Sequence, residues 1–198
     1  MRARMALAYA NITIELREIL LSDRPDELYV ASSKGTVPVL QFSDGSVIDE
    51  SFDIMKWCLE QVKTDWLDIN FGDQLSVIKV NDEDFKSWLN KYKYHQRHPE
   101  QSIDFYQEKC VKILLEHEET LSNKLFLFGE KPQVADVAIF PLVRQFAHVD
   151  LSFFTKKLPH LNRWLETWKE SKLFQSIMKK YDKWEPNQTP LIVTFNNE

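Results

Sequence analysis

The 198-residue sequence predicts an α+β fold: a small α/β unit followed by an all-helical unit. Two observations predict this order. Apolar residues alternate with polar ones in short runs before Ser51, which is typical of strands, and repeat with a helical period beyond it. Asp44-Gly45 separates two short apolar runs, as in a tight β-hairpin. The expected boundaries are residues 1–63 for the first domain, 64–75 for a linker and 76–198 for the helical domain.

The first domain is expected to contain a helix, a strand, a loop, a hairpin and a second helix. Residues 1–10 favour helix, and Ile12, Ile14 and Leu16 alternate with polar residues as in a half-buried strand. Residues 39–42 and 47–48 flank the Asp-Gly turn. From Ser51 the apolar residues form one face of a helix: Ile54, Met55, Cys58, Leu59 and Val62.

The second domain is expected to be helical up to an extended tail at residues 185–198. Two helical stripes come first, along residues 77–92 and 103–121. His117 lies on the second stripe and is expected to be a core histidine. Residues 134–147 are apolar nearly all round, which predicts a helix at the centre of a bundle, and Pro159 suits the first turn of the next helix.

Composition excludes several classes of protein. Hydrophobic residues make up 43% and aromatic residues 13% of the chain, too many for a disordered protein. The net charge of -5 disfavours nucleic acid as a partner, so the basic and aromatic run at residues 91–99 is interpreted as a solvated helix end. No apolar run approaches the roughly 20 residues that span a bilayer, and a cytoplasmic protein without a membrane partner is expected. Cys58 and Cys110 have no metal-ligand spacing, so no metal is expected.

Two dipeptides at the ends of the stretch 37–51 are candidate binding elements. Val37-Pro38 precedes a strand; a trans proline would simply start the strand, whereas a cis bond would turn the Val37 backbone outward. Glu50-Ser51 opens a helix, where Ser51 would cap free amides or help them bind an anion such as a ligand carboxylate. Glu50 is either a solvated charge or the partner of a ligand ammonium. A ligand with both charges on one carbon suits this pair.

The stretches KGTVPVL and VIDES, followed later by VADVAIFPLVRQF and PHLNRWLETW, resemble the glutathione S-transferase family over nearly the whole chain. The resemblance implies a thioredoxin-like first domain with Pro38 as a cis proline. It implies that the Val37 backbone pairs with the cysteinyl part of glutathione. Ser51 and the amide behind it would hold the γ-glutamyl carboxylate, and Glu50 would face the γ-glutamyl ammonium.

The resemblance also implies a function. Glutathione would be conjugated to, or exchanged with, a small electrophile or disulfide, in a homodimer without a metal. Trp88 and Tyr92 would line the pocket for this second substrate. The alternative is a non-catalytic binding or dimerisation module on the same scaffold.

The sequence departs from the family pattern at two places. In the family a first strand and a Cys, Ser or Tyr that activates glutathione precede the first helix, whereas MRARMALAYANI resembles that helix itself. The activating residue is therefore expected upstream of Met1, and no catalytic residue is assigned within the chain. Gln133 stands where a Ser or Thr usually caps the central helix, three residues before Asp136. A weaker helix start is expected there.

Overall fold

The computed structural model of the protein describes residues 1–67 and 70–195. The chain forms two compact units. The first comprises Met1–Lys63 and the segment from Ser171 onward, and the second comprises Thr64–Glu170. The sequence predicts a helical domain over residues 76–198, whereas in the structure the segment from Ser171 onward packs with the α/β unit.

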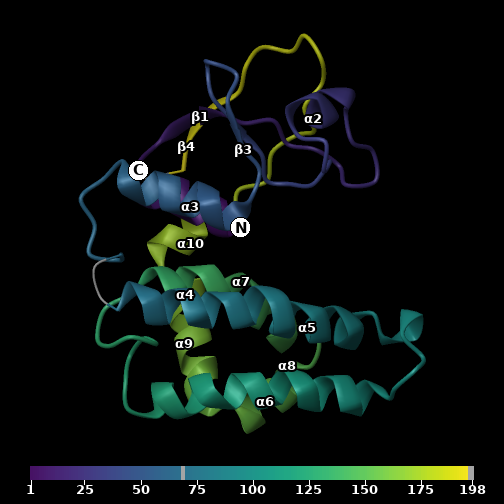
Figure 1. Ribbon diagram of the computed structural model, residues 1–198, viewed down its shortest axis with the longest axis vertical. Helices are drawn as coiled ribbons and strands as arrows, with labels where there is room; N and C mark the ends of the chain where they lie inside the picture. The colour runs from purple at the N-terminus through teal and green to yellow at the C-terminus, as the bar shows by residue number, and fades with distance from the viewer. Residues whose placement is uncertain (68–69, 196–198) are drawn as a thin grey trace. The chain divides into compact units, whose positions relative to one another are not determined.

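The first unit contains short strands and helices from both ends of the chain (Figure 1). Its elements, in chain order, are α1 (Arg2–Tyr9), β1 (Thr13–Glu15), α2 (Asp26–Ala31), β2 (Leu40–Gln41), β3 (Val47–Ile48), α3 (Ser51–Glu60), α10 (Lys172–Ser176) and β4 (Ile192–Thr194).

The core of the first unit lies between α1 and α3, which pack against each other. The apolar stripe expected on α3 is buried, as are the apolar side chains of α1. The side chains in this contact are at most 5% exposed: Ala3, Met5, Ala6, Leu7, Ile54, Met55, Cys58 and Leu59. The helix α10 packs on α1 and adds Phe174 to the core.

The C-terminal segment forms a strand that the sequence analysis did not expect. β4 pairs antiparallel with β1, with Thr13 opposite Thr194 and Glu15 opposite Ile192 (Figure 1). The amide of Leu16 donates to the carbonyl of Leu191 at 2.8 Å and extends this ladder. Residues far apart in the sequence therefore share one small sheet.

The hairpin predicted at Asp44-Gly45 is present. β2 and β3 are antiparallel, with Leu40 opposite Ile48 and Gln41 opposite Val47. Gly45 has φ 87°, a left-handed conformation that glycine adopts easily. The side chain of Asp44 accepts hydrogen bonds from the amide and the hydroxyl of Ser46, which stabilises the turn.

The second unit is helical throughout its regular elements. These are α4 (Phe71–Val80), the π-helical turn η1 (Asn81–Phe85), α5 (Lys86–Lys93), the 3₁₀ turn η2 (His95–Arg97), α6 (Ile103–Ser122), α7 (Val134–Ala147), α8 (Leu151–Lys157) and α9 (Pro159–Glu170). α4 begins inside the stretch 64–75, which the sequence analysis expected to be a linker. Within the described residues, no single helix has the length and apolarity to cross a bilayer, although the bent pair of α7 and α8 would pass on length and composition alone.

The start of α7 is buried and is capped by its own residues Gln133 and Asp136 and by Gln74 from α4. Gln74 on α4 accepts a hydrogen bond from the amide of Ala135 at 3.0 Å, and its own amide group donates to the carbonyl of Trp66 at 3.2 Å. The carboxylate of Asp136 accepts from the amide of Gln133 at 2.9 Å, the reciprocal position expected from the sequence. Gln133 and Asp136 thus form a reciprocal capping box, in which Gln133 takes the place of the usual Ser or Thr, and Gln74 adds an acceptor for a further amide.

Candidate functional site

The hairpin β2–β3 brings both candidate dipeptides to one end of the first unit. Because the strands are antiparallel and Leu40 lies opposite Ile48, Pro38 before β2 and Glu50 after β3 lie at the same end. The Val37–Pro38 peptide bond is cis. Val37 is 46% exposed, so its backbone lies in a segment that a ligand can reach.

A tight turn precedes these residues and fixes the backbone of Lys34. The amide of Gly35 donates to the carbonyl of Ser32 at 3.0 Å. Gly35 has φ 59°, and a Cβ at this position would lie 2.3 Å from a ring carbon of Tyr29. A larger residue would therefore clash here, and glycine is required by both its conformation and its contact.

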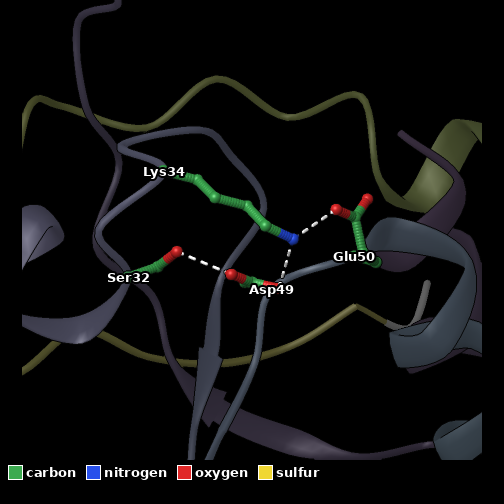
Figure 2. A network of polar contacts seen from close by, with 4 residues as sticks. All are labelled: Ser32, Lys34, Asp49 and Glu50. Atoms are coloured by element: carbon green, nitrogen blue, oxygen red, sulfur yellow. Dashed lines mark hydrogen bonds and ion pairs between the residues drawn. The ribbon is translucent and has the colours of Figure 1, made fainter.

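A polar network connects this turn to the start of α3 (Figure 2). The hydroxyl of Ser32, which is buried, donates to Oδ2 of Asp49 at 2.7 Å. The ammonium of Lys34 donates to Oδ1 of Asp49 at 3.0 Å and to Oε1 of Glu50 at 2.6 Å. One lysine thus bridges two neighbouring carboxylates.

The network favours the charged forms of Lys34 and Asp49. The hydrogen bond from Ser32, and then that from Lys34, lowers the pKa of Asp49. The hydrogen bonds to Glu50 and then to Asp49 raise the pKa of Lys34. The site therefore presents two adjacent carboxylates with an ammonium already seated on them.

The start of α3 has no capping hydrogen bond from the side chain of its N-cap residue. This N-cap residue is Glu50, with φ -108° and ψ 130°. Ser51 is the first helical residue and not the cap that the sequence suggested. The first amides of this 10-residue helix, together with its dipole, favour a negative group beside the hydroxyl of Ser51.

Sequence reasoning did not identify Ser32, Lys34 and Asp49 as site residues. Ser32 and Lys34 reach Asp49 across 17 and 15 positions, respectively. Lys34 and Asp49 lie inside the stretches KGTVPVL and VIDES, and Ser32 lies two residues before Lys34, but nothing in these stretches pairs the three side chains. Their pairing depends on the hairpin register, which the sequence leaves open.

The two residues expected to line a second pocket lie in the helical unit. Tyr92 is 2% exposed, packs against Phe146 with ring centroids 5.4 Å apart, and accepts a hydrogen bond from Gln107 at 2.8 Å. Its ring is therefore part of the core. Trp88 is half-buried, and the ammonium groups of Lys91 and Lys109 lie 5.2 and 5.7 Å from its ring centroid.

The two cysteines are unsuited to thiol chemistry. Cys58 and Cys110 are both fully buried, and burial raises the pKa of each thiol to about 12. A neutral, inaccessible thiol is a poor nucleophile. Within the described residues, no group of three or more His, Cys, Asp or Glu side chains could hold a metal ion.

Two models of one protein family match the chain, one in each of its two parts. The N-terminal domain of glutathione S-transferases matches residues 1–61, and the C-terminal domain of the same family matches residues 100–167. No curated protein sequence matches the chain significantly.

Solved structures share the fold. Glutathione S-transferase I bound with lactoylglutathione has a TM-score of 0.72 at 21% identity, covering 88% of this chain and 90% of that one. Glutathione transferase F7 from Populus trichocarpa has a TM-score of 0.73 at 19% identity, and the match covers 88% of this chain and 90% of that one. The glutathione transferase URE2P6 from Phanerochaete chrysosporium, in complex with oxidized glutathione, has a TM-score of 0.70 at 18% identity, and the match covers 88% of this chain and 87% of that one.

These matches confirm the expected fold class, a thioredoxin-like α/β domain followed by an all-helical domain. The chain belongs to the glutathione S-transferase family.

Proposed function

We propose that the protein binds glutathione at the end of the β2–β3 hairpin where Pro38 and Glu50 lie, away from the Asp44-Gly45 turn. The observation that carries the proposal is the start of α3, where the carboxylate of Glu50 lies directly before uncapped helix amides and Ser51. One end of glutathione, the γ-glutamyl group, carries an ammonium and a carboxylate on the same carbon. Glu50 suits the ammonium, and Ser51 with the amide behind it suits the carboxylate.

The exposed backbone at Val37 and Pro38 supplies the second part of the proposed site. The cysteinyl part of glutathione is a peptide, and its amide and carbonyl can pair with the Val37 backbone as in a short strand. Glutathione would then be held at two points, by its charged end and by its central peptide group.

The chemistry that we propose is conjugation of glutathione to a small electrophile, or thiol exchange with a small disulfide. Membership of the family supports it. Trp88, the more accessible of the two aromatic candidates, is the proposed contact for an apolar second substrate. The buried cysteines take no part in this chemistry, and a homodimer stays a prediction.

Calorimetric titration with glutathione tests the proposal. Glu50→Gln and Ser51→Ala should each weaken binding about tenfold or more, because hydrogen bonds to charged groups contribute about 1.5–3 kcal/mol. Ser46→Ala, in the exposed turn of the same hairpin, is the matched control and should bind like the wild type.

Binding that is unaffected by both variants would place glutathione elsewhere. If no heat of binding is measured at millimolar glutathione, the result favours the alternative function, a non-catalytic binding or dimerisation module. Consumption of glutathione with a model electrophile, measured in parallel, separates an enzyme from a binding protein.

A further inference from the structure

The ammonium of Lys34 occupies the place that the proposed function gives to the ligand. It lies 2.6 Å from Oε1 of Glu50 and 3.0 Å from Oδ1 of Asp49 (Figure 2). We propose that Lys34 competes with a ligand ammonium for Glu50. The ligand must displace Lys34 from Glu50, and this exchange sets how strongly the site selects ligands with an amino group. The inference rests on the proposed glutathione site.

Displacement follows from electrostatics. A second ammonium placed on Glu50 would lie close to that of Lys34, and the two like charges would repel each other. A ligand ammonium therefore does not simply add to the existing pair. It replaces Lys34 on Glu50.

The two halves of the Lys34 bridge differ in a way that decides which one breaks. The side chain of Glu50 is 60% exposed, whereas that of Asp49 is 28% exposed. Asp49 is also held by the hydroxyl of buried Ser32. Lys34 can therefore leave Glu50 while it stays on Asp49, and the fixed turn at Gly35 keeps its backbone in place.

The consequence is a weakened preference for amino-bearing ligands. In the wild type, the gain from pairing the ligand ammonium with Glu50 is partly offset by the loss of the Lys34 pair. An analogue without the amino group does not need to displace Lys34. The affinities of the two ligands should therefore differ less while Lys34 is present than in its absence.

The experiment compares glutathione with its deaminated analogue, glutaryl-cysteinyl-glycine, by calorimetry on the full chain. Lys34→Gln should bind glutathione about two- to fivefold more tightly than the wild type, the range expected for an exposed ion pair. Its affinity for the analogue should not rise. Lys56→Gln is the matched control, since Lys56 is a half-exposed lysine on α3 that pairs with Asp53 at 2.7 Å. It should leave the ratio of the two affinities within twofold of the wild type.

Two results would overturn the inference, and they differ in what they mean for the proposed function. If glutathione binds but Lys34→Gln weakens binding or leaves it unchanged, Lys34 is not a competitor, while the proposed site stands. If neither the wild type nor a folded Lys34→Gln variant binds glutathione at millimolar concentration, both proposals fail. Circular dichroism of each variant shows whether it is folded.

Discussion

Asp136 connects three segments of the helical unit through one buried carboxylate. Its oxygens accept hydrogen bonds from the amide of Leu127 at 3.0 Å, the amide of Gln133 at 2.9 Å and the indole of Trp164 at 2.9 Å. The residue is fully buried, and this burial raises the pKa of its carboxyl to about 6 despite the donors. A buried charge is tolerated here because N–H groups surround it.

Asp136→Asn should lower the free energy of unfolding by about 2 kcal/mol at pH 7. An amide offers one acceptor oxygen where the carboxylate has two, and each buried donor left unsatisfied costs about 1–3 kcal/mol. Urea unfolding measures the change. Asp150→Asn is the control, because Asp150 caps the exposed start of α8 and asparagine is an equally good cap. A loss no larger than that of the control would show that Asp136 does not hold the unit together.

His117 should make the protein sensitive to acid. Burial lowers the pKa of its imidazole from 6.5 to about 4. The unfolded chain binds a proton below pH 6.5 that the folded chain excludes, so the stability from His117 is complete above pH 6.5 and is lost as the pH falls to about 4. The loss is on the order of 3 kcal/mol. His117→Gln should remove it, as unfolding at several pH values can show.

Asp136 titrates in the opposite sense. Its folded pKa of about 6 lies above the ordinary 3.8, so the folded chain keeps a proton that the unfolded chain loses. Its contribution is therefore complete below about pH 4 and falls as the pH rises to about 6. The two residues offset each other in the wild type, and the pH profiles of Asp136→Asn and His117→Gln should diverge in opposite directions. Parallel profiles would contradict both assignments.

At the scale of elements, β4 depends on one buried side chain. Val193 is 9% exposed, whereas its neighbour Ile192 on the opposite face of the strand is 63% exposed. This alternation matches the pairing of β4 with β1.

Val193→Asp should destabilise the first unit by about 2–4 kcal/mol, because a charge would replace a buried apolar side chain. Ile192→Asp tests the same strand on its exposed face and should change stability by less than about 1 kcal/mol. The amide of Leu16 donates to the carbonyl of Leu191, so its rate of hydrogen exchange measures directly whether the C-terminal strand stays paired with β1. Equal effects of the two variants would argue against the β1–β4 pair.

The sequence predicted elements whose signals are local. The Asp44-Gly45 pair predicted the hairpin, and the stripe from Ile54 to Leu59 predicted α3 with its buried face. Elements that depend on a distant partner were not predictable. Residues 192–194 are too short a run to indicate which strand they join, and nothing near Gln133 indicates that Gln74 caps α7 from another helix.

Contacts between distant residues were also not predictable at the candidate glutathione site. The local patterns at Val37-Pro38 and Glu50-Ser51 leave alternatives open, and the resemblance to the family assigns them to a binding site. The bridge from Lys34 to Asp49 and Glu50 depends on where two loops meet after folding. Charged side chains on loops are common, so their pairing becomes visible only in three dimensions.

At the scale of the whole molecule, the two units have separate cores and each matches one domain of the same family. The resemblance in the sequence was sufficient for the family because it combines stretches from both domains. Residues at the C-terminal end nevertheless complete the first unit, which a division of the sequence into consecutive domains does not anticipate.

Mapping glutathione by NMR on the ¹⁵N-labelled full chain tests the central claim most directly. We predict that the amide signals of Val37, Ser51 and Phe52 shift together and saturate at millimolar glutathione, while the exposed turn at Ser46 does not respond. Shifts confined to the helical unit, or no shifts at this concentration, would contradict a glutathione site at the start of α3.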